Sequence, residues 1–148
     1  GIAALKSGCD IVTDTQMAKA GINKTILASL GGEVHCFMSD PDVAQEARSR
    51  GVTRAFVSME KAAALEKPCI FAIGNAPTAL LSLEQLMEEG KAAPALIIGV
   101  PVGFVNVEIS KERIIEKARA PYIVARGRKG GSNVAAAICN ALLYQIRR

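Results

Sequence analysis

Three glycine-containing loops carry most of the residues whose types and spacing could do chemistry. They read GNAPT at residues 74–78, GVPVGFVNVEISKE at residues 99–112 and RGRKGGS at residues 126–132. Each loop follows a short apolar run and leads toward a predicted helix. The first turn of a helix offers free backbone N–H groups and the positive end of the helix dipole. The spacing therefore predicts a site for an anionic small molecule.

The RGRKGGS loop is the strongest candidate among the three. A glycine pair lets a ligand approach the backbone closely, and an arginine can bind a carboxylate through two parallel hydrogen bonds. The alternative is a tight turn with solvated charges. We expect a carboxylate or phosphate clamp made of these residues: Arg126, Arg128, Lys129, Gly130, Gly131 and Ser132, the last of which should also cap the final helix.

The other two loops leave alternatives open. In the first loop, Gly74, Asn75 and Thr78 either contact the ligand or only start a helix. The second loop is longer than a turn requires, and its apolar residues could line a pocket or an oligomer interface: Val102, Phe104 and Val105. No loop matches a Walker A motif or GxGxxG, so the sequence gives little support for a nucleotide-binding site.

His35 is the only histidine, and histidine is the side chain that most readily exchanges a proton near neutral pH. We expect it near the middle of a strand at residues 34–38, whereas Ser39 and Asp40 occupy the carboxyl end of that strand. This position favours a structural role. Without His35 the chain offers no Ser/His/Asp or Cys/His constellation, and no pair of acids stands out.

The elements that must position these loops alternate along the chain as strand, loop and helix. We expect strands at residues 10–13, 34–38, 69–73, 95–100 and 122–125, and helices at residues 15–20, 43–50, 59–65, 77–89, 110–118 and from 132 onward. Asp40 and Pro41 should start the second helix. This order predicts one α/β domain over residues 1–148, a three-layer, doubly wound, mostly parallel five-stranded sheet. Ligands of such sheets bind at the carboxyl ends of the strands.

Composition narrows the partners. The formal charge is +4, but a cluster of cations at residues 126–148 accounts for it. A local cluster suits a small anion better than nucleic acid, which needs a wide basic face, and the chain has no Trp to stack on bases. No apolar run is long enough to cross a membrane. The cysteines form no CxxC, so we expect buried thiols in a reducing cytosol, with a metal site as the weak alternative: Cys9, Cys36, Cys69 and Cys139.

Four segments in this order resemble the precorrin-8X methylmutase family, including its cobalt-precorrin-8 members. They are TDTQMAKAGI at 13–22, GNAPTAL at 74–80, GVPVGFVNVEISKE at 99–112, and YIVARGRKGGSNVAAAICNAL at 122–142. The resemblance covers nearly the whole chain. It departs from the expected pattern at Ile109, in VEISKE, where we expect variation to be tolerated.

The resemblance implies a flavodoxin-like fold, a cytoplasmic homodimer and an isomerase of cobalamin biosynthesis. This enzyme moves a methyl group from C11 to C12 of precorrin-8X or cobalt-precorrin-8, giving hydrogenobyrinic or cobyrinic acid, and it needs no cofactor and no metal. The substrate is a flat corrinoid polycarboxylate. We expect these residues of the loops to bind it: Gly74, Asn75, Thr78, Gly103, Phe104, Ser110, Lys111, Arg126, Arg128, Lys129, Gly130, Gly131 and Ser132.

The resemblance also implies that the catalytic histidine lies upstream of Gly1, in a segment that this chain does not contain. His35 does not match that motif, so we assign no catalytic residue within the chain. We expect a truncated chain or a fragment that keeps much of the substrate floor and does not catalyse the methyl shift alone. The alternative function is a non-catalytic, flavodoxin-like protein that binds a tetrapyrrole or a phosphorylated ligand.

Overall fold

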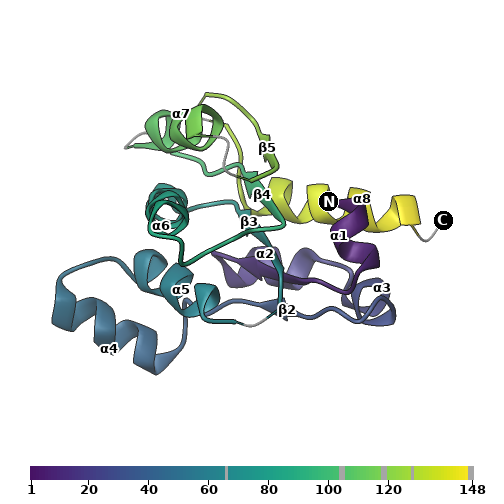
Figure 1. The fold of residues 1–148 in the computed structure, drawn as a ribbon, viewed down its shortest axis with the longest axis horizontal. Coiled ribbons are helices and arrows are strands. Elements are labelled where there is room, and N and C mark those ends of the chain that lie inside the picture. The colour runs from purple at the N-terminus through teal and green to yellow at the C-terminus, as the bar shows by residue number, and fades with distance from the viewer. Residues whose placement is uncertain (66, 104–105, 118–119, 128, 147–148) are drawn as a thin grey trace.

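A computed structural model describes residues 1–65, 67–103, 106–117, 120–127 and 129–146. Its centre is one parallel sheet of five strands in the order β2-β1-β3-β4-β5, drawn in Figure 1. The strands are β1 (Asp10–Thr13), β2 (Val34–His35), β3 (Cys69–Ile73), β4 (Leu96–Gly99) and β5 (Tyr122–Val124). This is the strand order of flavodoxin-like doubly wound folds, the fold that the family resemblance implies.

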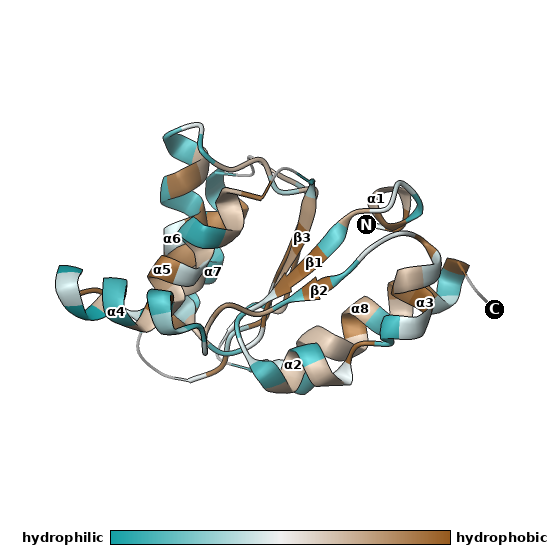
Figure 2. Cartoon of the chain, turned by 90° about the horizontal axis from the view of Figure 1, so that it is seen from below, coloured by the Kyte–Doolittle hydropathy of each residue, from teal (hydrophilic) through white to brown (hydrophobic). Residues whose placement is uncertain are grey.

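Helices cover both faces of the sheet, which makes three layers (Figure 2). One face carries α1 (Ile2–Lys6), α2 (Gln16–Gly21), α3 (Lys24–Ser29) and α8 (Ser132–Ile146). The other carries α5 (Arg54–Ala63), α6 (Pro77–Glu88) and α7 (Val107–Lys117), with α4 (Pro41–Arg50) outside α5. No helix in the described ranges is long and apolar enough to span a membrane.

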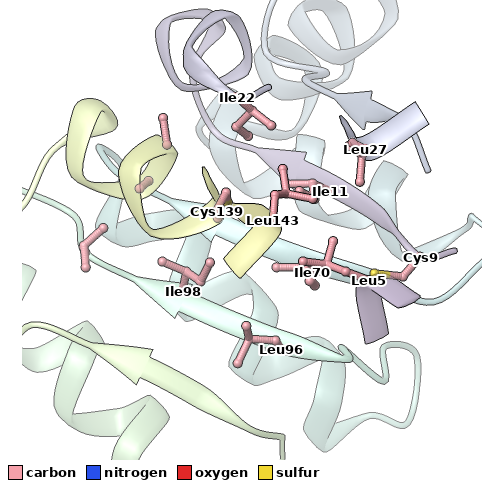
Figure 3. Close-up of a cluster of buried hydrophobic side chains, with 14 residues drawn as sticks. Leu5, Cys9, Ile11, Ile22, Leu27, Ile70, Leu96, Ile98, Cys139 and Leu143 are labelled. Carbon is pink, nitrogen blue, oxygen red and sulfur yellow. The ribbon is translucent and has the colours of Figure 1, made fainter. Parts of the chain in front are cut away.

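The core is divided in two by the sheet, because successive side chains of a strand point to opposite faces. Ile70 and Ala72 of β3 pack toward α8, in the cluster that Figure 3 shows. Phe71 and Ile73, their neighbours in the sequence, pack toward α5 and α6. All of β3 is buried, which explains its continuous apolar sequence CIFAI.

Several predicted bounds were wrong. β2 ends at His35, not at residue 38, because the chain turns there and the Asp40 amide donates to the Phe37 carbonyl. The apolar side chains of Phe37 and Met38 pack in the core cluster that includes α5 and do not extend the strand. Helices α5 and α7 begin at Arg54 and Val107, earlier than expected, and the sequence analysis missed α1 and α3.

Two predicted helix caps also differ from the structure. Asp40 occupies the N-cap position of α4 but makes no side-chain cap bond, because its carboxylate instead accepts from Lys61 Nζ at 2.6 Å. Ser132 is the first residue of α8 and does not precede it. Its hydroxyl lies 2.8 Å from that of Thr15, the N-cap of α2.

Candidate functional site

The loops after β3 and β5 meet at the carboxyl edge of the sheet. A Cβ built on Gly74 would lie 2.7 Å from the Gly131 carbonyl oxygen and from the Ser132 Cα. A Cβ on Gly130 would lie 2.0 Å from the Val100 carbonyl oxygen, and the Gly131 amide donates to that oxygen at 2.9 Å. Both contacts exclude any side chain, so the glycines let the loops approach each other closely.

Asp14 fixes the first loop. It directly follows β1, is 1% exposed, and its carboxylate accepts from the backbone amides of Gly74, Asn75 and Ala76 at 2.8, 2.9 and 2.6 Å. Burial raises the pKa of the Asp14 carboxyl, and the three amide bonds oppose that rise. The loop backbone is therefore bound to the end of the neighbouring strand.

A hydroxyl pair joins α2 to α8 beside this carboxylate. Thr15 Oγ1 and Ser132 Oγ lie 2.8 Å apart, and Thr15 Oγ1 also accepts from the Ala18 amide as the N-cap of α2. The N-termini of α2 and α8 therefore meet at one point. Two helix dipoles converge there with their positive ends, which favours a bound anion.

Lys111 fixes the RGRKGGS loop from the interior of the protein. The side chain belongs to α7 and is fully buried, and Nζ donates to the carbonyl oxygens of Gly127 and Lys129 at 2.8 and 2.9 Å. Burial lowers the pKa of its ammonium, while Glu108 on the same helix acts in the opposite direction. Lys111, which the sequence predicts to contact the ligand, thus contacts the backbone of the loop from the interior of the protein.

The exposed side chains of the site come from both loops. Asn75, Arg126 and Lys129 are exposed, and Arg126 Nε lies 3.4 Å from a Glu112 carboxylate oxygen in a surface ion pair. Such a pair contributes little stability, so the guanidinium can exchange this partner for a ligand carboxylate at small cost.

The remaining predicted binding residues are less exposed or lie outside the described ranges. Ser110 is fully buried and donates to the Val107 carbonyl, and Thr78 accepts from the Thr53 hydroxyl. Gly103 lies in the loop after β4, with φ at +130°. Phe104 and Arg128 lie outside the described residues, as does Val105. Contact of these residues with a ligand stays a prediction.

His35 lies away from these loops. Its Nε2 is 2.9 Å from Asp10 Oδ2, and its ring stacks on Phe37. Asp10 is the first residue of β1 and also binds Lys67 Nζ at 2.9 Å. Asp14 lies four positions after Asp10 along β1 and its end, about 13 Å at ~3.3 Å per residue. His35 ends β2 and is not in mid-strand as predicted, but its contacts are those of a residue that ties β2 to β1.

All four cysteines are free and buried, as expected from their apolar surroundings. Burial raises the pKa of Cys69 to about 11 and that of Cys139 to about 12. Thiols with such pKa values are poor nucleophiles at neutral pH. Their role in the fold is that of small apolar side chains.

Sequence reasoning missed Asp14 and Thr15 as residues of the site. The available signal was their position directly after a buried strand, at the edge where ligands of doubly wound sheets bind. An acid at that position is bonded either to a ligand or to a neighbouring loop. Here the carboxylate binds the GNAPT loop.

The fold and this edge define a doubly wound α/β protein whose glycine loops pack together at the carboxyl edge of the sheet. The family profile of precorrin-8X methylmutase (CbiC) matches residues 1–145, and the chain belongs to that family. It is 49% identical to a cobalt-precorrin-8 methylmutase of Priestia megaterium over 142 residues, which are 96% of this chain and 63% of that protein.

Two further relatives agree with this assignment. A cobalt-precorrin-8 methylmutase of Salmonella typhimurium is 49% identical over 97% of this chain and 67% of its own length. A crystal structure of precorrin-8X methylmutase from Thermus thermophilus superposes with a TM-score of 0.84 at 38% identity, covering 97% of this chain and 69% of that one. The chain therefore spans about two thirds of the length of these proteins.

Proposed function

We propose that this chain forms the substrate floor of an isomerase of cobalamin biosynthesis. The reaction moves a methyl group from C11 to C12 of precorrin-8X or cobalt-precorrin-8 and gives hydrogenobyrinic or cobyrinic acid. One observation carries the proposal: in a chain of this family, the GNAPT and RGRKGGS loops are packed together at one sheet edge.

The contacts of this edge suit a flat polycarboxylate. Arg126 and Lys129 offer exposed cations in the RGRKGGS loop, and the N-termini of α2 and α8 meet at Ser132, the last residue of that loop. Exposed apolar side chains lie on the segments that flank the same edge: Met17 of α2, Val102 after β4 and Ile109 of α7. A macrocycle with an apolar face and carboxylates on its rim would find a partner for each part.

The role of these residues in the reaction is binding and orientation. Fixing the macrocycle lowers the entropic cost of reaching the reactive geometry, and fixed dipoles stabilise charge that develops in the ring. The methyl shift also needs a proton donor for the ring. We assign no residue of this chain to that role.

The site residues of the proposal include two that the structure does not describe. Phe104 would contribute an aromatic contact, and Arg128 a third cation of the loop.

We further propose that the protein works as a homodimer in the cytoplasm, as the resemblance implies. Size-exclusion chromatography with light scattering tests the dimer, and a monomeric mass at micromolar concentration would contradict it.

A titration with three ligands tests the function. Hydrogenobyrinic acid should bind and change its absorbance, whereas FMN and inorganic phosphate should bind at least about tenfold more weakly. Tighter binding of FMN or phosphate would favour the alternative, a non-catalytic flavodoxin-like protein. Raised salt should weaken binding of the acid, because exposed charges are screened.

A second assay measures conversion of cobalt-precorrin-8, with the Salmonella typhimurium relative as the active control. We expect this chain to bind the substrate without isomerising it, since we assign no proton donor within it. Turnover at the rate of the control would support the isomerase and disprove that assignment.

A further inference from the structure

The ammonium of Lys111 is a charge buried under a loop that already carries cations. Removing an ammonium from water is unfavourable, and a neutral donor could bond to a backbone carbonyl equally well. Lys111 nevertheless is 0% exposed and donates to two carbonyls of the RGRKGGS loop. The charge itself therefore calls for an explanation beyond the two hydrogen bonds.

Peptide geometry gives the bonds a direction. In a trans peptide, the carbonyl of one residue and the amide N–H of the next point in opposite directions. The described part of the chain contains no cis peptide. Because the Lys129 carbonyl points inward to the buried Lys111 ammonium, the Gly130 N–H points away from that ammonium. One residue later, the Gly131 amide turns back and donates to Val100.

On the basis of the proposed function, we propose that Lys111 is a positioning residue for anion recognition. Its buried ammonium draws the loop carbonyls inward, and this turns the Gly130 N–H toward a carboxylate of the substrate. Its positive charge also adds to the attraction of that carboxylate across a region of low dielectric. Lys111 thus acts through the loop backbone and not by contact with the substrate.

The test compares three variants in a titration with hydrogenobyrinic acid. Lys111→Met keeps the apolar stem and removes the charge, and it should weaken binding by tenfold or more. Lys111→Arg restores the charge and the donors and should recover most of that loss. The matched control is Lys67→Met, because Lys67 also donates to a carbonyl, that of Gly31, but lies at the amino edge beside Asp10. It should change the affinity less than twofold.

The wild-type protein supplies a second measurement that needs no variant to fold. With 15N-labelled lysine, the Lys111 Nζ signal should shift when hydrogenobyrinic acid is added to saturation, and the Lys67 signal should not. A folded Lys111→Met protein with wild-type affinity, or an unmoved Lys111 signal at saturation, overturns the inference and leaves the proposed function standing. Absence of wild-type binding removes the proposed function, and the inference with it.

Discussion

Asp14 and Lys111 hold two neighbouring loops by opposite means. The carboxylate of Asp14 accepts three backbone amides of the GNAPT loop, and the ammonium of Lys111 donates to two carbonyls of the RGRKGGS loop. Both side chains are buried, so both sets of hydrogen bonds form where water does not compete. Charges of this kind fix backbone that would otherwise be free to move at the sheet edge.

Replacing Asp14 by Asn should loosen the first loop. The Asn side chain can accept only through its oxygen, and its amide group would face N–H donors, so at least one buried amide loses its acceptor. A lost buried bond of this kind costs about 1–3 kcal/mol of folding stability. Urea unfolding would measure that cost, and affinity for hydrogenobyrinic acid should fall with it. Unchanged stability and affinity would show that Asp14 does not hold the loop.

Replacing His35 by Ala should leave binding of the acid within twofold of the wild type. The side chain bonds to Asp10 at the other end of β1, and Asp10 retains Lys67 and the Glu33 amide as partners. We expect a loss of about 1 kcal/mol in folding stability. A large loss of affinity, with the fold preserved in circular dichroism, would place His35 in the site.

At the scale of elements, the glycines decide how closely the loops pack. Gly130 lies against the backbone of Val100, where a Cβ would lie 2.0 Å from the carbonyl oxygen. Gly90, which follows α6, has φ at +75° and nothing within 4 Å of such an atom. Gly130 is therefore required for close packing of the loop, whereas Gly90 is required only for its backbone conformation.

Gly130→Ala should displace the RGRKGGS loop and weaken binding of hydrogenobyrinic acid by tenfold or more. The contact is with backbone, which cannot move aside as a flexible side chain would. Gly90→Ala, the control, should cost about 1 kcal/mol of stability from its positive φ and leave the affinity unchanged. Equal affinities for the two variants would mean that the approach of Gly130 to Val100 has no part in binding.

The elements could be predicted where local pattern and tertiary packing agree. The run at β3 has five consecutive apolar residues between a proline and a glycine, and its bounds were predicted correctly. The apolar pattern continues past the end of β2, because Phe37 and Met38, which lie in the turn after the strand, pack against helices. Helices α1 and α3 have five and six residues, too few for a periodic signal.

The candidate site was predictable as loops but not as bonds. Glycine content and position after strands indicated the GNAPT and RGRKGGS segments, which the structure brings together. The partners of Asp14 lie 60 or more positions away, and those of Lys111 lie 16 and 18 away. No local pattern encodes such pairings, because they depend on which strands become neighbours.

At the scale of the whole molecule, the two ends of the sheet carry different charges and different tasks. The carboxyl edge gathers loops and helix N-termini around exposed cations. The amino edge carries Asp10, buried and bonded to His35, Lys67 and the Glu33 amide. Burial alone would raise the pKa of the Asp10 carboxyl, but these partners outweigh burial and hold that pKa below its ordinary value.

The contribution of Asp10 to stability should therefore disappear in acid. A carboxyl whose pKa is lowered by folding stabilises the fold fully above its unfolded pKa of about 3.9, and the contribution is lost as pH falls through the lower folded value. Asp10→Asn should cost about 1–3 kcal/mol at neutral pH and progressively less below about pH 4. Urea unfolding of both proteins from pH 2 to 7 checks this, and a difference that is constant with pH would contradict it.

Helix α4 lies outside α5, at the margin of the molecule in Figure 1. Its buried side chains, Val43 and Ala47, form a small cluster with Val57 of α5, separate from the two clusters that flank the sheet. A helix held in this way can unfold locally while the sheet stays intact. Its amide protons should exchange with deuterated water at least about a hundredfold faster than those of α6, which packs directly on the sheet. Equal exchange rates in α4 and α6 would show one cooperative unit. Unequal rates would mean that α4 opens and closes many times between global unfolding events, while the GNAPT and RGRKGGS loops stay undisturbed.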